Sequence, residues 1–203
     1  MPPQTPEPAV CLASMSPRRR QLLVQIGVPH RVSAPHIDEA VRPAEPAADY
    51  VVRMARSKAL TVARTSPGLP VLAADTIVVL DERILGKPAG AAEGLAMLEQ
   101  LSGRSHAVLT AVALASATGL AFRLSASEVR LRRLSRAECQ SYWDSGEPHD
   151  KAGAYAVQGR GAVFIEYLAG SYSGVMGLPL YETAELLRAA GVPYWQHAPG
   201  APP

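Results

Sequence analysis

The sequence predicts an α/β protein, because segments with the patterns of strands and of helices alternate along its 203 residues. The clearest strand covers residues 71–80, an apolar run broken only by one polar pair. The clearest helix covers residues 91–101, where Leu95, Leu98 and Leu101 recur at helical spacing. A chain of this length can bury a sizeable core, either as one large domain or as two small lobes.

The first strand and the first helix are predicted close to the N-terminus. Residues 10–13 form a short apolar run that is typical of a buried strand. Ser16 then occupies a helix N-cap position, and Pro17 occupies the first helical position, where a missing N–H costs nothing. Gly27 is expected to end this helix after residues 18–26.

The start of this helix is suited to binding an anion. A helix N-terminus offers free backbone N–H groups and a partial positive charge. Two serines and two arginines lie at that end: Ser14, Ser16, Arg18 and Arg19. We therefore expect them to hold a phosphate group.

The middle of the chain continues the alternation of elements. Residues 28–46 are rich in proline and acidic residues and are expected to form a strand and a loop. Residues 45–64 predict a long helix, because their apolar side chains make one broad side. Residues 81–83 are expected to form a hairpin-like turn. Two strands are predicted over residues 106–116 and 120–132, and the second alternates apolar and polar residues, so that one face is wet.

A helix start is encoded in the C-terminal third of the chain. Ser135 and Glu138 form a capping box, which predicts a helix that ends at Gly146. Beyond it we expect a glycine-rich segment over residues 151–161, a strand over 162–168, a turn-rich stretch over 170–174 and a final helix over 180–190.

Two cationic residues and one acid are placed where chemistry could need them. Asp75 lies inside the apolar strand, where a carboxylate is costly unless it is paired or bound to a cation. Either the strand end turns to solvent there, or Asp75 is a metal ligand or general base at the edge of a cleft. Lys58, taken alone, is typical of a solvated helix face. Lys87 lies between a glycine and a proline, where the backbone can approach a ligand closely.

Two loop segments add candidate polar groups. Asp38 and Glu39 are paired acids, which are usually only solvated and which matter if their loop folds over the same cleft as Asp75. Gln158 lies in the glycine-rich segment, whose glycines either only allow turns or shape a site. Its amide offers both a donor and an acceptor and could therefore bind the edge of a nucleotide base.

The composition argues against several classes of function. A net charge of +2, without a basic stripe that interleaves aromatic residues, argues against nucleic-acid binding. Cys11 and Cys139 lie far apart without a CxxC pattern, and the histidines have no metal-binding spacing. The cysteines are therefore expected to be reduced thiols in a cytoplasmic protein. No apolar run approaches the ~20 residues of a membrane helix.

The ends of the chain differ from its centre. Residues 1–9 lack the charged and apolar regions of a signal peptide and are expected to form a disordered, proline-rich tail. Residues 196–203 are expected to be a frayed tail. Residues 10–195 are then expected to form a single domain.

Six segments of the chain, taken in order, resemble the Maf family of nucleoside triphosphate pyrophosphatases. They are LASMSPRR at 12–19, IDE at 37–39, the helix lysine Lys58, AADTIVVL at 73–80 with ILGKP at 84–88, LSGRSHAVLTAV at 101–112, and DKAGAYAVQGRGAVFIEYLAGSYSGVMGLPL at 150–180. The resemblance implies an elongated, mixed-sheet α/β fold with a deep cleft between two lobes. It also implies cleavage of a nucleoside triphosphate to the monophosphate and pyrophosphate.

The segment around Gln158 resembles the branch of this family that acts on dTTP and UTP. The resemblance implies that Arg18, Thr76 and Gln158 determine specificity. It implies that Asp75 is the catalytic acid–base residue, supported by one acid and two phosphate-facing lysines, namely Glu39, Lys58 and Lys87. Ser14, Ser16 and Arg19 remain candidates for holding phosphate.

The charge of the triphosphate calls for a divalent cation as cofactor. We expect Mg²⁺, or else Mn²⁺ or another divalent ion, with Glu39 and Asp75 as its protein ligands. Asp75, directly or through the cation, would activate a water for attack at the α-phosphorus.

Two alternatives stay open at this stage. One is a nucleotide-binding regulator of cell division or septum formation that needs no catalysis. The second is a natural substrate among modified pyrimidine nucleotides such as 5-methyl-UTP, since a methyl group changes the fit by only ~1–3 kcal/mol. The family also allows a homodimer, although no residue marks an interface.

Overall fold

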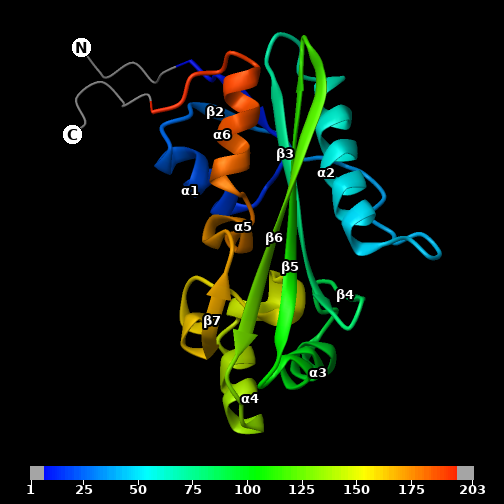
Figure 1. Cartoon of the computed structure of the whole chain (residues 1–203), viewed down its shortest axis with the longest axis vertical. Coiled ribbons are helices and arrows are strands. Elements are labelled where there is room, and N and C mark those ends of the chain that lie inside the picture. Colours follow the sequence, from blue (N-terminus) through cyan, green and yellow to red (C-terminus); the bar gives the residue numbers. More distant parts are fainter. Residues whose placement is uncertain (1–6, 196–203) are drawn as a thin grey trace.

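The computed structural model describes residues 7–195, in which a mixed sheet runs along the length of an elongated molecule (Figure 1). Its strands are β1 (Val10–Leu12), β2 (His30–Val32), β3 (Val71–Leu80), β4 (Arg83–Leu85), β5 (Ser105–Ser116), β6 (Gly119–Leu131) and β7 (Ile165–Ala169). Their order is β2-β1-β3-β5-β6-β7, with β4 paired to β3. β1 is parallel to β2 and β3, and the other pairs are antiparallel. The predicted α/β class is confirmed.

Helices cover both faces of the sheet and one end of its long strands. They are α1 (Pro17–Gln25), α2 (Ala47–Ala63), α3 (Ala91–Leu101), α4 (Arg136–Asp144), α5 (Tyr172–Met176) and α6 (Leu180–Ala189). α2 lies on one face of the long strands, α1 and α6 lie on the other side, and α3 and α4 lie at the opposite end of the molecule (Figure 1). Within residues 7–195, no helix is long and apolar enough to cross a membrane.

The long central strand β3 is buried on both faces, which explains its nearly continuous apolar sequence. Ala73 and Ile77 pack with α2. Leu72 and Ala74 point the other way and pack with the apolar residues of α1 and α6. Successive side chains of a strand alternate between faces, so β3 contributes to a core on each side. Toward its C-terminal end, Val78 and Leu80 belong to a third core with α3 and α4.

A gap in strand pairing opens one edge of β3. β1 pairs with β3 only at Val71 and Leu72, and β4 pairs with it only from Val78 onward. Between them, Asp75 and Thr76 have no strand partner on that edge among the described residues. Because they are consecutive, Asp75 faces α2 and Thr76 faces α1. The gap therefore accounts for a polar pair in an otherwise apolar strand.

The predicted helix ends are mostly confirmed. The Ser135 capping box is present, with the hydroxyl accepting from the Glu138 N–H at 3.3 Å. Gly27 follows α1 with a φ of +63°, which suits glycine. Ser16 occupies the N-cap position, but its side chain makes no capping bond. Its own N–H donates instead to the Ser14 hydroxyl, at 3.2 Å.

Two predictions in the C-terminal third are wrong. The strand expected over 162–168 begins only at Ile165, because residues 160–164 form a 3₁₀ turn whose first two N–H groups are bound by Glu147. The stretch over 170–174, expected to be turns, contains the start of α5. The Ser171 hydroxyl caps this helix by accepting from the Gly174 N–H at 2.9 Å. Of the predicted tails, residues 1–6 and 196–203 lie outside the described residues.

Candidate active site

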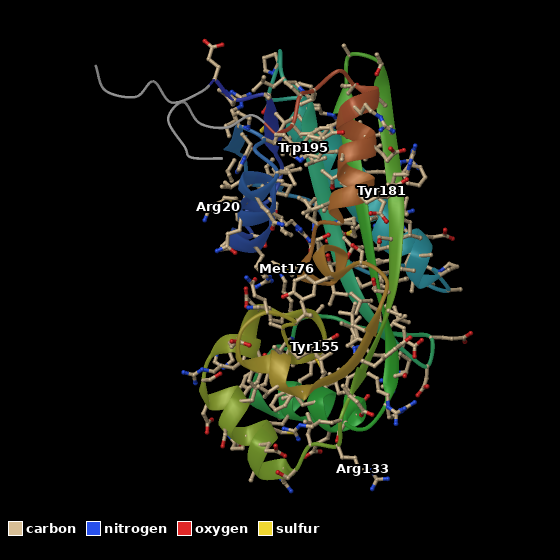
Figure 2. All side chains as sticks on the ribbon, turned by 60° about the vertical axis from the view of Figure 1, so that its left-hand side comes forward. Arg20, Arg133, Tyr155, Met176, Tyr181 and Trp195 are labelled. Atoms are coloured by element: carbon tan, nitrogen blue, oxygen red, sulfur yellow. The ribbon has the colours of Figure 1, made fainter. Side chains whose placement is uncertain are left out.

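A cleft of about 690 Å³ lies over the open edge of β3, within the size range of ligand sites. Met176 and Tyr155 line it from two sides (Figure 2). Among its lining residues are all ten side chains that the sequence predicts for the site: Ser14, Ser16, Arg18, Arg19, Glu39, Lys58, Asp75, Thr76, Lys87 and Gln158. The fold thus brings these distant segments together, while the role of each residue stays a prediction.

Lys58 joins two of the predicted acids. Its Nζ lies 2.6 Å from Asp75 Oδ1 and 2.7 Å from Glu39 Oε1. Lys58 and Asp75 are only 7% and 9% exposed, because α2 packs this face against β3. Tyr50 holds the loop in place by donating to the Glu39 carbonyl at 2.9 Å. Lys58 is therefore not a solvated helix residue, and the paired-acid loop does reach the cleft beside Asp75.

The charge of Glu39 depends on its cationic neighbours. Burial works to raise its pKa, but the hydrogen bond and charge of Lys58, with smaller effects of Lys87 and Arg19, hold that pKa below its ordinary value. Glu39 is thus ionised at neutral pH. Asp75 uses only Oδ1 toward Lys58, so its Oδ2 has no hydrogen-bond partner in the described part of the chain.

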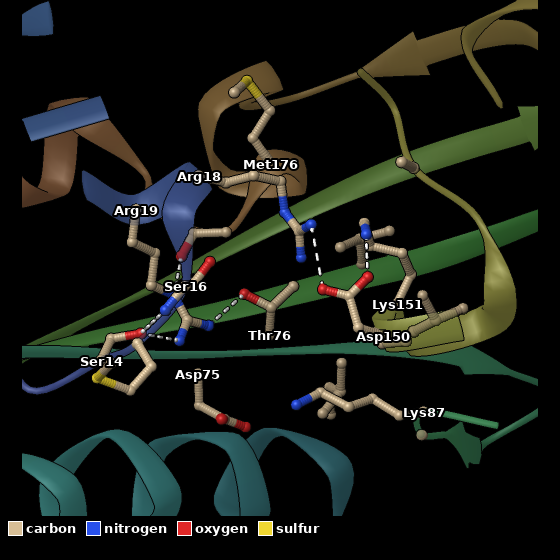
Figure 3. Close-up of a pocket in the computed structure, with 18 of the residues that line it drawn as sticks. Ser14, Ser16, Arg18, Arg19, Asp75, Thr76, Lys87, Asp150, Lys151 and Met176 are labelled. Atoms are coloured by element: carbon tan, nitrogen blue, oxygen red, sulfur yellow. Dashed lines mark hydrogen bonds and ion pairs between the residues drawn. The ribbon is translucent and has the colours of Figure 1, made fainter. Parts of the chain in front are cut away.

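Arg19 is held by hydrogen bonds on the face of β3 that α1 covers. Its Nε donates to the Gly177 carbonyl at 2.8 Å, and its terminal nitrogens donate to Ser14 at 3.2 Å and to Thr76 at 3.3 Å (Figure 3). The Thr76 hydroxyl also lies 3.0 Å from the hydroxyl of Thr110. Burial lowers the pKa of Arg19, yet a guanidinium stays charged in proteins. Arg19 therefore presents a fixed positive charge to the cleft.

The remaining cations are less constrained. Arg18 lies 3.7 Å from Asp150, an acid that also pairs with Lys151 (Figure 3). Lys87 extends toward Asp75 from the opposite side of the cleft (Figure 3). Five basic and three acidic side chains line the cleft in all, so it is positive although the whole chain is nearly neutral.

Sequence reasoning assigned no role to several lining residues. Asp150 and Lys151 lie in the segment 150–180, which resembles the family as a whole. A charged pair at the start of a glycine-rich stretch is the sequence signal that could identify them. Tyr155 lines the cleft and is only 5% exposed, and its hydroxyl lies 2.7 Å from Nε2 of the buried His106. Nothing in the sequence pairs these last two residues.

The acids of the cleft could hold a hard cation only with help from a ligand. In the part of the chain that the structure describes, no three His, Cys, Asp or Glu side chains form a group that could bind a metal ion. Glu39 and Asp75 converge on one ammonium and supply two carboxylates. Mg²⁺ prefers one or two carboxylates together with substrate phosphates, so this donor set fits that ion when a phosphate is present.

Comparisons with known proteins agree on one family. The family described as Maf-like protein matches residues 9–190. A dTTP/UTP pyrophosphatase of Bordetella parapertussis is 53% identical over 194 residues, which cover 91% of this chain and 94% of that protein. The dTTP/UTP pyrophosphatases of Methylobacillus flagellatus and Alkalilimnicola ehrlichii are 54% and 51% identical, over 90% and 94% of this chain and 93% and 96% of those proteins.

The buried His106 is expected to make the stability of the protein depend on pH. Burial lowers its pKa from 6.5 to about 4, so the unfolded chain binds a proton first as the pH falls. The contribution of neutral His106 to the free energy of unfolding is present in full above pH 6.5 and declines as the pH falls toward 4. At pH 5 the loss from this group is about 2 kcal/mol.

Urea unfolding of the wild type and of His106→Gln at pH 8 and pH 5 measures this effect. The glutamine can still bond Tyr155, but it does not titrate in this range. The stability of His106→Gln should fall less between the two pH values. Equal losses in both proteins would contradict the assignment.

Proposed function

Since the chain belongs to the Maf family, we propose that it hydrolyses dTTP and UTP to the monophosphate and pyrophosphate and so removes these nucleotides from the cellular pool. The observation that carries the proposal is one cleft in which Asp75, with an unpaired carboxylate oxygen, lies among basic side chains. The names of the relatives support the choice of substrates.

The basic side chains match the charge of the substrate. A nucleoside triphosphate carries about four negative charges, which must be balanced before water can attack phosphorus. Arg19 is held rigidly by three hydrogen bonds and suits planar contact with a phosphate, whereas Lys87 acts as a point charge. Arg18 can exchange Asp150 for a phosphate oxygen, since its 3.7 Å contact is long.

The acids are suited to activating water. Lys58 binds Asp75 through Oδ1, which leaves Oδ2 of this cleft-lining residue free to act on a ligand. Oδ2 can accept a proton from a water that attacks the α-phosphorus, and pyrophosphate is the leaving group. Glu39 and Asp75, with phosphate oxygens of the substrate, would hold Mg²⁺ or Mn²⁺, which supplies charge neutralisation at the triphosphate.

Asp75→Asn tests the role of Asp75 in catalysis. The amide oxygen can still accept from Lys58, so the fold is retained, but the base is lost. We expect kcat for pyrophosphate release from UTP to fall by about 10²–10⁴-fold, with the circular dichroism spectrum and UTP binding retained. Turnover close to that of the wild type would contradict this role. A wild type that binds UTP and releases no pyrophosphate would instead favour a regulatory nucleotide-binding protein.

Gln158→Ala tests the selection of the base. The amide can pair with the donor and acceptor edge of uracil or thymine. We expect the wild type to prefer UTP and dTTP over CTP, and the variant to lose about tenfold of that preference, the equivalent of one or two hydrogen bonds. A substrate panel that includes 5-methyl-UTP, scored by pyrophosphate release, gives the ratios. An unchanged preference would remove Gln158 from base recognition.

A further inference from the structure

Two side chains, Tyr142 and Glu147, bind the backbone of the loop that carries Gln158 (residues 156–161). Tyr142 belongs to α4, and Glu147 begins the 3₁₀ turn that follows it (Glu147–Asp150). Gln158 itself is exposed and lines the cleft. Its side chain has no hydrogen-bond partner within residues 7–195, so the backbone of its loop decides where its amide lies.

Three backbone N–H groups of this loop bind those two side chains. The N–H of Ala156 donates to Tyr142 Oη at 3.1 Å. The N–H groups of Arg160 and Gly161 donate to the two carboxylate oxygens of Glu147, each at 2.9 Å. Tyr142 donates in turn to Glu147 Oε1 at 2.8 Å. Both sides of the loop are thus tied to one carboxylate.

Two glycines of this loop pack closely against the same two side chains. A Cβ at Gly159 would lie 2.5 Å from Glu147 Oε2, and its backbone has a φ of +90° that favours glycine. A Cβ at Gly161 would lie 2.5 Å from Tyr142 Oη. Gly159 and Gly161 both follow Gln158, and both lie against the two side chains that bind the N–H groups of the loop.

Glu147 is also connected to the charged wall of the cleft. Its carbonyl accepts from Lys151 Nζ at 3.0 Å. Burial works to raise the pKa of its carboxyl, but the N–H groups of Gly161 and Arg160 and the hydroxyl of Tyr142 hold that pKa below its ordinary value. A carboxylate can accept all three of these bonds, whereas an amide in its place cannot.

We propose that Glu147, with Tyr142, is a positioning residue that selects the base by fixing the loop of Gln158 in the cleft. Neither side chain needs to touch the substrate, since Tyr142 binds the backbone before Gln158 and Glu147 binds the backbone after it. The inference rests on the proposed function, because it assumes that Gln158 binds a pyrimidine.

Glu147→Gln is the principal test. The glutamine keeps the size of the side chain but replaces one acceptor with an NH₂ group, so one of the two N–H bonds is lost. We expect the KM for UTP to rise about tenfold, kcat to change less than about threefold, and the preference for UTP over CTP to fall about tenfold. Tyr142→Phe, which keeps the buried ring, is a second variant that should move the same ratio in the same direction.

Glu138→Gln is the matched control. Glu138 also accepts three hydrogen bonds, from Arg132, from the Ser135 N–H and from the Ser135 hydroxyl, but it caps α4 and makes none with the Gln158 loop. Thermal unfolding should show a loss of stability in both variants. Only Glu147→Gln should change the UTP to CTP ratio, because only that change frees the loop.

A double-mutant cycle with Gln158→Ala identifies the route of the effect. If Glu147 acts through Gln158, then Glu147→Gln should leave the UTP to CTP ratio unchanged in the Gln158→Ala background. Any of three results would overturn the inference while the proposed function stands. The UTP to CTP ratio could be unchanged in Glu147→Gln, or it could fall equally in Glu138→Gln. It could also fall further when Glu147→Gln is added to Gln158→Ala. A wild type that releases no pyrophosphate would overturn both.

Discussion

The ion pair between Lys58 and Asp75 is the interaction on which the site depends. Both side chains are almost fully buried between α2 and β3, where an unpaired charge is strongly destabilising. The same ammonium binds Glu39 at the mouth of the cleft, so one lysine connects a strand, a helix and a loop. Replacement of a buried ion pair by apolar residues of similar size is often neutral or stabilising, so this pair is weak evidence for stability by itself.

The gap in pairing between β1 and β4 makes this pair accessible. In a fully paired β3, Asp75 and Thr76 would point to separate faces of a closed sheet. Here the open edge lets both faces contribute to one cleft, so that the acids on the α2 side and Arg19 on the α1 side surround the same space. The short β1 thus shapes the cleft, because its pairing with β3 ends before the polar pair begins.

Local patterns predicted most of the fold and part of the site, whereas Lys58, Glu39 and Thr76 were predicted through the resemblance to the Maf family. Alternation and capping residues identified the long strands and α4, and the polar pair in β3 identified Asp75. The sequence could not show the gap in β3, because strand pairing depends on distant residues. It also missed the start of β7, because Glu147 binds the backbone of residues 160 and 161 from thirteen or more positions away. For the same reason Tyr155 and His106 could not be paired. The divalent cation and the homodimer stay predictions.

The energetic coupling of Lys58 and Asp75 tests the central claim most directly. The free energy of unfolding in urea should be measured for the wild type, Lys58→Met, Asp75→Asn and the double variant. We predict that Lys58→Met alone costs about 3–5 kcal/mol, because it leaves the carboxylate buried and unpaired. The double variant should recover most of this loss, with a coupling of at least about 2 kcal/mol. Costs that simply add, to within about 0.5 kcal/mol, would contradict the claim that this ion pair organises the site.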